Sequence, residues 1–421
     1  MSDTEPKAEL APRRRHAPSL DGGLELRPAG PDDHEAIIRL SADAHGGHDG
    51  EIVRALIARP HDPGEWLVVV DGDRVVSTCT LLRQTLRVGP VELPVGQVEY
   101  VATEADYRRR GLVAAQFAEH HRRSAARGDL VNLVYGIPYF YRRLGYGYGL
   151  GASVRRPVRT RLPPSDDGFT VRSATTGDLE AIEVLDRAAR AAADVAVLRS
   201  SEKWAWLREN CESWGAQVLV VERGGTVEGW ARVQSWEAWD EKIAIIEEIG
   251  ASSTAAAHAA MAAAVDRLPD VEMWVRDRPG TPVSAAVEAV THESALYDAV
   301  YVRFGDPVAV VEALRPVLSA RLKDSALNGE TGALDISLFS AGIRLHYEPG
   351  EVVGVEAIPG EEDPLDDGNV GVAPDHLPAL VLGRFDPREL ERRHDDVSFG
   401  RFRELMTILF PQQTADVLDV I

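Results

Sequence analysis

A segment near residue 100 combines residue types that suit a ligand carrying phosphate groups. It reads Val98-Glu99-Tyr100-Val101-Ala102-Thr103, a short link, then Tyr107-Arg108-Arg109-Arg110-Gly111-Leu112-Val113. The first part has the pattern of a strand, and the second opens directly into a helix. Backbone N–H groups at a helix start lack partners and carry partial positive charge, so they bind a pyrophosphate, and flanking arginines add charge-assisted hydrogen bonds. Gly111 lets the ligand approach the backbone.

A second, aromatic segment follows a predicted strand over 130–135. It reads Gly136-Ile137-Pro138-Tyr139-Phe140-Tyr141-Arg142-Arg143-Leu144-Gly145-Tyr146-Gly147-Tyr148 and predicts a short helix that carries aromatic residues. Taken alone, a tyrosine in such a cluster is more often a packing residue than a catalytic one. An RRRG turn alone is more often a solvated basic face. The occurrence of both segments in one chain favours a binding site.

Together, VEYVATEADYRRRGL and YFYRRLGYGYG resemble the GNAT acetyltransferase superfamily. There, the first segment is the acetyl-CoA motif and the second packs beside the reacting thioester. From roughly Leu24 to Ile421 the chain resembles the Eis (enhanced intracellular survival) group in architecture, which implies an α/β (α+β) fold. In this group two tandem GNAT folds, the second degenerate, precede a sterol-carrier-protein-like domain. The implied activity transfers acetyl from acetyl-CoA to an amine of an aminoglycoside- or polyamine-type molecule, or to a protein lysine.

The resemblance also implies roles for residues of the first segment. Backbone groups of Val101 and Thr103 would pair with pantetheine. The pyrophosphate contacts would come from Arg108, Arg109 and Gly111, with the amides of Leu112 and Val113. The superfamily usually has a small residue where this chain has Val113, and many Eis-like sequences share that departure.

For the general acid, the resemblance implies Tyr141, three residues before the leucine of the LGYG signature. Coenzyme A leaves as a thiolate with a reference pKa of about 8.5, and a phenol with a pKa of about 10 can hydrogen-bond or protonate it. Tyr139 is the alternative, because it shares a face with Tyr141 if the segment is extended.

The attacking amine must also lose a proton, since a lysine-like amine with a pKa of about 10.4 is almost fully charged at neutral pH. The Eis group implies the C-terminal carboxylate as acceptor, here that of Ile421. A free carboxylate with a pKa of about 3.5 is a poor base unless it is desolvated or relayed by water. Glu99 is an alternative base, and Asp416 and Asp419 are alternative anchors for a cationic substrate.

Two stretches of the chain repeat each other and indicate a duplicated α/β unit. Leu26 to Ile37 and Val171 to Ile182 align without a gap, and each has a strand, an aspartate suited to cap a helix, and helical apolar spacing. A strand, helix and strand are predicted over 97–103, 112–127 and 130–135, and again over 243–249, 252–268 and 271–276. The second copy lacks an Arg/Gly cluster. Beyond 303 we expect a helix over 307–322, kinked at Pro316, and strands over 334–338 and 343–347.

These patterns divide the chain into four parts. We expect a flexible tail over 1–23, a GNAT domain with the acetyl-CoA site over 24–160, and a second, degenerate GNAT domain over 161–305. A sterol-carrier-protein-like domain with a C-terminal tail is expected over 306–421.

Composition narrows the partners further. The 421 residues include 46 Lys and Arg against 67 Asp and Glu, and the net charge of -21 argues against nucleic acid and anionic membranes and for cationic substrates. No export signal and only two cysteines, Cys79 and Cys211, indicate the cytoplasm. We expect no metal site, because the two histidines within 45–49 sit in a glycine-rich stretch interpreted as a solvated loop. The Eis resemblance implies a homo-oligomer, often a hexamer. The alternative function is binding of coenzyme A or lipid without turnover.

Overall fold

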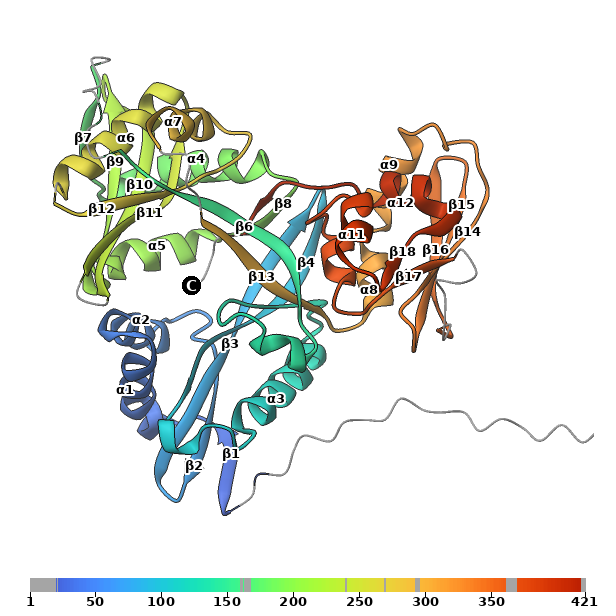
Figure 1. The fold of residues 1–421 in the computed structure, drawn as a ribbon. Helices are drawn as coiled ribbons and strands as arrows, with labels where there is room; N and C mark the ends of the chain where they lie inside the picture. Colours follow the sequence, from blue (N-terminus) through green and yellow to red (C-terminus); the bar gives the residue numbers. More distant parts are fainter. Residues whose placement is uncertain are drawn as a thin grey trace, which may run out of the picture.

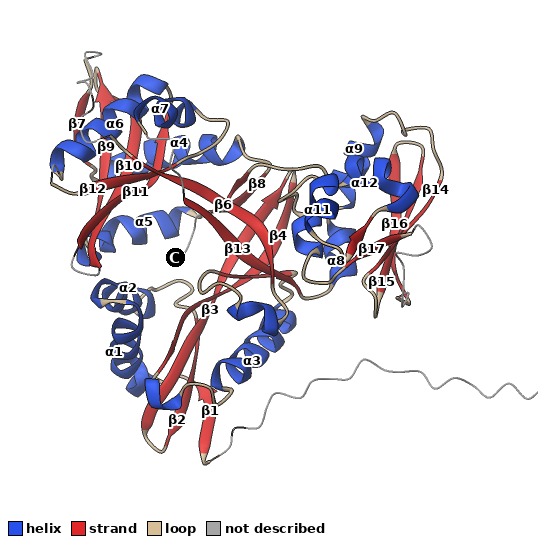
Figure 2. Ribbon diagram, viewed as in Figure 1, coloured by secondary structure: helices blue, strands red, loops and turns tan. Residues whose placement is uncertain are grey.

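The computed structural model describes residues 20–417, except 21, 160–161, 163–167, 239–240, 269, 292–295 and 361–368. Most of the predicted tail, as well as Asp419 and Ile421, lies outside this part. Within it, fourteen strands join in one long sheet and five form a second sheet. Figure 1 shows the two units that share the long sheet, and Figure 2 shows helices flanking its strands.

In the first unit, the two segments predicted to form the binding site lie on consecutive elements. Its helix α3 has the bounds that the sequence predicts, because Gly111 and Gly128 flank it with left-handed backbone. Strands β1 to β4 are antiparallel neighbours, and β4 pairs with β5 in parallel. The elements are β1 (Leu24–Pro28), α1 (His34–His45), α2 (Gly47–Ile57), β2 (Glu65–Asp71), β3 (Arg74–Val88), β4 (Val91–Thr103), α3 (Leu112–Arg127), β5 (Val131–Val134) and β6 (Gly147–Pro157).

The second unit repeats this order. Its sequence-predicted strand, helix and strand are β11, α6 and β12. The elements are β7 (Thr170–Ser173), α4 (Leu179–Ala191), β8 (Val195–Leu198), α5 (Ser201–Asn210), β9 (Ala216–Arg223), β10 (Thr226–Ala238), β11 (Glu241–Ala251), α6 (Thr254–Arg267), β12 (Glu272–Arg276), α7 (Pro282–Val290) and β13 (Leu296–Phe304).

The repeated aspartates, Asp33 and Asp178, bind the same partners in both units. Each carboxylate pairs with an arginine six residues earlier, at 2.7 and 2.8 Å, and accepts a backbone N–H three residues earlier, at 2.7 Å in both. Neither side chain bonds to the helix that follows. Each predicted capping aspartate therefore caps the short 3-10 turn that leads into the helix, residues 31–33 and 176–178, rather than the α-helix itself.

The two units also exchange strands. Strand β13 of the second unit lies between β5 and β6 of the first, with Tyr301 opposite both Val134 and Tyr148. Strand β6 in turn extends to β12, where Arg156 lies opposite Val275. The long sheet is continuous because each unit donates one strand to its neighbour.

The third unit packs on this sheet through a shared apolar core that includes Leu150, Val302 and Leu380. The predicted helix over 307–322 is two helices, because Pro316 lacks the N–H that an uninterrupted helix needs. The second sheet has the order β16-β15-β14-β17-β18. The elements are α8 (Pro307–Ala313), α9 (Arg315–Lys323), β14 (Gly332–Ser337), β15 (Gly342–Glu348), β16 (Glu351–Ile358), β17 (Val370–Val372), α10 (Leu377–Val381), α11 (Pro387–Arg393), β18 (Val397–Ser398), α12 (Arg403–Leu409) and β19 (Ala415–Asp416).

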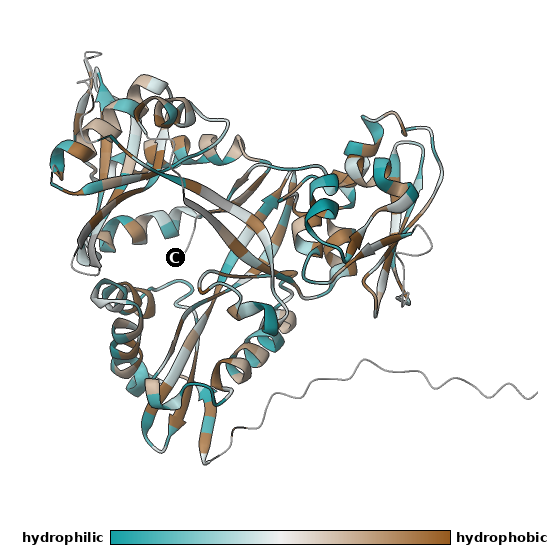
Figure 3. Ribbon diagram, viewed as in Figure 1, coloured by the Kyte–Doolittle hydropathy of each residue, from teal (hydrophilic) through white to brown (hydrophobic). Residues whose placement is uncertain are grey.

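Hydrophobic and hydrophilic residues alternate along the helices, as expected of helices with one buried face (Figure 3). Among the described helices, none is both long enough and apolar enough to span a bilayer.

Candidate active site

Strand β4 carries a β-bulge in the middle of the first predicted segment. Thr78 of β3 lies opposite Ala102 and Thr80 lies opposite Glu99, so that Tyr100 and Val101 together face one residue of β3. Tyr100 has a φ of 52°, which is unusual for a side chain of its size, and its ring stacks on Trp66 with centroids 6.2 Å apart. A bulge bends its strand and increases the local twist.

The bend separates β4 from β5. Their parallel pairing ends at Val98 and Val134, and a cleft of about 1060 Å³ lies beyond this point. The cleft contains every residue predicted to bind acetyl-CoA, together with the predicted acid: Val101, Thr103, Arg108, Arg109, Gly111, Leu112, Val113 and Tyr141. The backbone edge of β4 that β5 leaves unpaired forms one wall.

At one end of the cleft, helix α3 begins without a side-chain cap. Gly111 is its N-cap residue with a φ of 80°, and an added Cβ there would meet no described atom within 4 Å. Gly111 is therefore required for its backbone conformation, and the space in front of it is free for a ligand. The first N–H groups of the helix, those of Leu112 and Val113, face this region without an intrahelical partner.

The three consecutive arginines before Gly111 do not act alike. Arg108 and Arg109 line the cleft and are exposed. The Arg108 Nε donates to the Thr103 carbonyl at 3.3 Å. Arg110 lies outside the cleft lining, donates to the Asp106 carbonyl at 2.9 Å and stacks over the Tyr107 ring. Two arginines thus line the cleft, and the third holds the loop.

Tyr141 lies at the opposite end, in the 3-10 helix η3 (Phe140–Leu144). It is 4% exposed and packs against Phe117 and Tyr301, with ring centroids 5.4 Å away in both cases. Its hydroxyl makes no hydrogen bond to another described residue. Burial, with a smaller contribution from Glu99, raises the pKa of Tyr141 well above the usual tyrosine value. The phenol is therefore a neutral proton donor at any physiological pH.

The structure does not bring the alternative acid, Tyr139, into the cleft. Tyr139 is 72% exposed, and its backbone N–H donates to the Tyr148 hydroxyl at 3.3 Å. Tyr139 itself has a φ of 65° and is followed by a 3-10 turn, so the segment is not extended there. Tyr139 and Tyr141 consequently do not share a face.

Glu99 lines the cleft from the position next to the bulge. Burial raises the pKa of Glu99 to about 8, although its Oε1 accepts a hydrogen bond from Gln97 Nε2 at 2.8 Å. The carboxylate of Asp49 lies near enough to contribute to this rise. A carboxyl group with such a pKa can exchange protons near neutral pH.

The expected solvated loop over 45–49 is wrong. His45 is the last residue of α1, Asp49 lies in the first turn of α2, and both line the cleft beside Glu99. Burial also raises the pKa of the Asp49 carboxyl, whose Oδ2 lies 3.2 Å from His48 Nε2. The available signal was a histidine and an aspartate four residues apart. The sequence does not show that both line one cleft, because Gly46 separates them into two helices.

Tyr135, which the sequence did not indicate, links the cleft to residues 414–417, here called the C-terminal segment. It follows β5, lines the cleft and donates its hydroxyl to the carbonyl of Val417, which is 1% exposed. The proposed substrate anchor Asp416 instead pairs with Arg278 at 2.5 Å and is 8% exposed, so that prediction is wrong. Asp419 and Ile421 lie outside the described residues.

One group of potential metal ligands occurs among the described residues, away from this cleft. His376, His394 and Asp396 of the third unit have ligand atoms within 4.8 Å of one another. The two imidazole rings stack with centroids 3.7 Å apart. None of the three lines the cleft, so the site chemistry does not involve them.

Residues 25–149 match the family model described as an acetyltransferase (GNAT) domain. The bulged strand, α3 and the aromatic turn all fall within this match. None of the curated proteins compared with the chain matches it. The chain is an acyltransferase, because the unit that contains the cleft matches this acetyltransferase domain model.

Three solved structures share the fold over nearly the whole chain. A GCN5-related N-acetyltransferase from Anabaena variabilis has a TM-score of 0.69 at 13% identity, covering 94% of this chain and 100% of that one. One from Kribbella flavida has a TM-score of 0.66 at 20% identity, covering 94% and 98%. Eis1 from Mycobacterium abscessus has a TM-score of 0.60 at 17% identity, covering 93% and 98%. The predicted α/β fold with GNAT-like units is confirmed.

Proposed function

We propose that this acyltransferase uses acetyl-CoA to acetylate an amine of a cationic small molecule of the aminoglycoside or polyamine type, or a protein lysine. One observation carries the proposal. A single cleft joins an uncapped helix N-terminus flanked by two arginines to a neutral tyrosine and two half-buried carboxyl groups. The first end suits a diphosphate, and the second suits acyl transfer to an amine.

Coenzyme A would occupy the cleft along β4. Its diphosphate would accept hydrogen bonds from the Leu112 and Val113 amides and from Arg108 and Arg109. Its pantetheine would pair with the free backbone edge at Val101 and Thr103. The bulge therefore serves binding, because it separates β4 from β5 and exposes this edge.

The transfer step then follows from the groups at the other end. The neutral amine nitrogen attacks the acetyl carbonyl carbon, the carbon–sulfur bond breaks, and Tyr141 donates its proton to the departing thiolate. Glu99, in its ionised form, accepts the proton that the amine loses. Its pKa of about 8 is closer to the pKa of the amine than the pKa of an ordinary carboxyl group is. The Ile421 carboxylate is the alternative acceptor.

Charge supports a cationic acceptor. Asp49 and Glu99 line the cleft, and the chain carries a net charge of -21. An ammonium group entering between two carboxyl groups favours their ionised forms, so substrate binding would itself activate Glu99. A neutral or anionic acceptor would lack this effect.

Release of free coenzyme A thiol from acetyl-CoA tests the proposal. Cys79 and Cys211 are both buried, so a thiol reagent should give little background with the native protein. We expect thiol release with a polyamine, an aminoglycoside or a lysine peptide, and none with a carboxylated amine such as glutamate. If coenzyme A protects the protein against heat but no cationic amine releases thiol, the protein binds the coenzyme without this turnover.

The same proposal includes a homo-oligomer, a cytoplasmic location and a sterol-carrier-like third unit that acts as a scaffold. Light scattering of the purified chain would measure its assembly, with a hexamer as the expected result.

A further inference from the structure

The second unit contains the same splayed strand pair as the first. Strand β11 pairs with β12 up to Ile246 and Val275, and a bulge at Glu247 follows, opposite Arg232 and Val233 of β10. We count residues from the last pair of each unit, Ile246 and Val275 here and Val98 and Val134 in the first unit. On the longer strand, Glu247 then corresponds to Glu99 and Ile249 to Val101. On the shorter strand, Arg276 corresponds to Tyr135. The two gaps therefore have equivalent positions in the fold.

In the second unit, arginine side chains fill the gap. Arg276 Nε lies 2.5 Å from Glu247 Oε2. Arg278 donates from Nη1 to the Ile249 carbonyl at 3.0 Å, whereas the corresponding residue Val101 is predicted to pair with pantetheine. Helix α6 is also capped, because the Ser253 hydroxyl accepts the Ala256 N–H at 3.2 Å. This gap lacks the uncapped helix start and the free backbone edge that coenzyme A requires.

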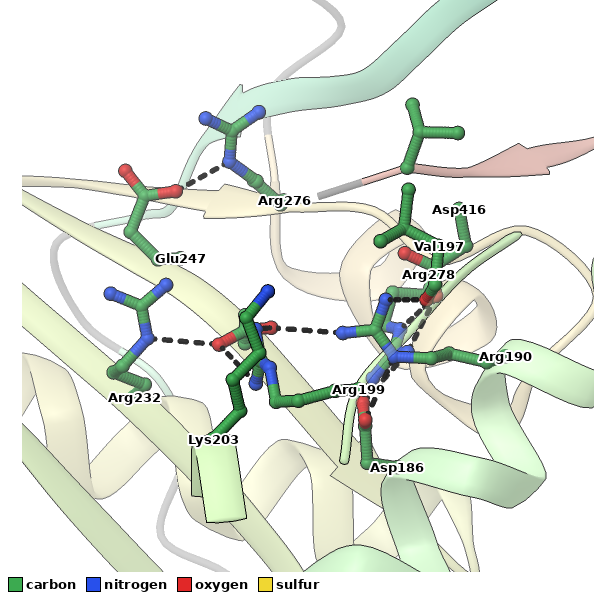
Figure 4. Close-up of polar contacts among 12 residues, drawn as sticks. Asp186, Arg190, Val197, Arg199, Lys203, Arg232, Glu247, Arg276, Arg278 and Asp416 are labelled. Atoms are coloured by element: carbon green, nitrogen blue, oxygen red, sulfur yellow. Dashed lines mark hydrogen bonds and ion pairs between the residues drawn. The ribbon is translucent and has the colours of Figure 1, made fainter. Parts of the chain in front are cut away.

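Arg278 is one member of a buried ion-pair network (Figure 4). Its Nε and Nη2 donate to Asp416 Oδ2 at 2.9 and 2.5 Å, and Nη2 lies 3.1 Å from Asp186. The network then runs from Asp186 to Arg190 at 2.8 Å and from Arg190 to Glu248 at 3.2 Å. Glu248 also pairs with Arg199 and Arg232.

The C-terminal segment supplies one of the carboxylates in this network. Its described members are four guanidinium groups, from Arg190, Arg199, Arg232 and Arg278, and three carboxylates, from Asp186, Glu248 and Asp416. Arg278 and Asp416 have side chains that are 6% and 10% exposed. A buried charge without its partner is strongly unfavourable, so Asp416 requires Arg278, which also pairs with Asp186.

Backbone contacts hold the same segment on both sides of Asp416. Thr414 bonds with Asp194, and residues 415–416 pair in parallel with β8 at Val195 and Ala196. One residue later, the Val417 carbonyl accepts the Tyr135 hydroxyl in the wall of the acyl-CoA cleft. The segment therefore connects the filled gap of the second unit to the open cleft of the first.

We propose that the second unit's gap has become a docking site for the chain's own C-terminal segment, and that Arg278 and Asp416 are positioning residues for the acyl-CoA cleft. Their ion pair fixes the carbonyl of Val417 against Tyr135 in the cleft wall. The effect on catalysis rests on the proposed function, whereas the docking itself does not.

Asp416→Asn tests the proposal in the full-length protein, because it removes the charge and preserves the shape of the side chain. Asp178→Asn is a matched control. Asp178 is also ion-paired and similarly buried in the second unit, at 6% exposed against 8% for Asp416, but it does not contact the segment. Hydrogen exchange of the amides in 195–197 and 414–417 reports docking, and thiol release reports turnover.

We expect exchange in both stretches to accelerate at least about tenfold in Asp416→Asn. We also expect kcat to fall about tenfold while protection by coenzyme A stays unchanged, with Asp416→Glu recovering part of both losses. Unchanged exchange in Asp416→Asn, or equal acceleration in Asp178→Asn, would overturn the docking. Faster exchange with an unchanged kcat would overturn the positioning role. If the wild type lacks turnover, the proposed function fails, but the exchange experiment still decides whether the segment docks.

Discussion

The two splayed strand pairs show how one backbone arrangement serves two purposes. In both units a parallel pair ends beside a bulge, at Val98 and Val134 in the first and at Ile246 and Val275 in the second. In the first unit Tyr135 and Gly136 follow the shorter strand, and a cleft remains. In the second, Arg276 ends the shorter strand and Asp277 follows it, and ion pairs occupy the equivalent region. The fold supplies the gap, and the side chains determine whether a ligand can enter.

The helices beside the two gaps differ in the same way. Helix α3 begins at a glycine without a side-chain cap, and two exposed arginines precede it. Helix α6 begins after Ser253, whose hydroxyl satisfies one of the first N–H groups. An anion is attracted where those N–H groups remain available. The comparison therefore predicts that coenzyme A binds only to the first unit.

The largest expected effect is on turnover after Tyr141→Phe. Loss of the proton donor should lower kcat about 1000-fold, as for other general acids, with little change in acetyl-CoA affinity. Tyr139→Phe is the control, since Tyr139 is 72% exposed and outside the cleft. Steady-state thiol release measures both. Equal losses in the two variants would remove Tyr141 from the mechanism.

Glu99 should give the reaction its pH dependence. The pKa of its carboxyl group is about 8, so kcat/KM should rise with pH and level off above that value, as the ionised base forms. Glu99→Gln should abolish the rise and lower kcat/KM about 100-fold at pH 9. Glu247→Gln, at the equivalent position of the second unit, should leave the profile unchanged. A wild-type profile that is retained in Glu99→Gln would assign the proton to another group.

The same raised pKa has a consequence for stability. Between an unfolded pKa of about 4.3 and the folded value of about 8, the folded protein binds more protons at Glu99 than the unfolded chain does. Stability from this residue should therefore decrease as the pH rises through that range. Denaturant unfolding of wild type and Glu99→Gln at several pH values should show a steeper decrease in the wild type.

A smaller effect is expected on coenzyme binding. Arg109→Ala removes a charge-assisted hydrogen bond to the diphosphate and should weaken acetyl-CoA binding about tenfold, with kcat largely retained. Arg110→Ala is the adjacent control, because Arg110 bonds to its own loop. If both substitutions weaken binding equally, general charge attraction rather than a defined contact holds the diphosphate.

The smallest effect should come from Ser253→Ala. Loss of this helix cap should cost about 1 kcal/mol of stability, measured by denaturant unfolding. Coenzyme A affinity should not change, because α6 does not border the open cleft. A change in affinity would show that the second unit takes part in binding.

Local sequence signals predicted much of this arrangement. Helix α3 and the residues of the β4 turn were predictable because glycines and a continuous motif fix them within a short stretch. The strand exchange was not, because Tyr301 of β13 reaches β5 across more than 150 residues of chain. The same reason concealed the contact of Tyr135 with Val417 and the presence of Asp49 in the cleft. Such contacts depend on tertiary pairing that periodicity does not encode.

The central claim is that the coenzyme's diphosphate binds at the start of α3 and at no equivalent place in the second unit. Calorimetric titration of coenzyme A into wild type, Arg109→Ala and Ser253→Ala tests it most directly. The account predicts one site per chain, weakened about tenfold in Arg109→Ala and unchanged in Ser253→Ala. Two sites per chain would contradict it. An affinity that is unchanged in Arg109→Ala but weakened in Ser253→Ala would also contradict it.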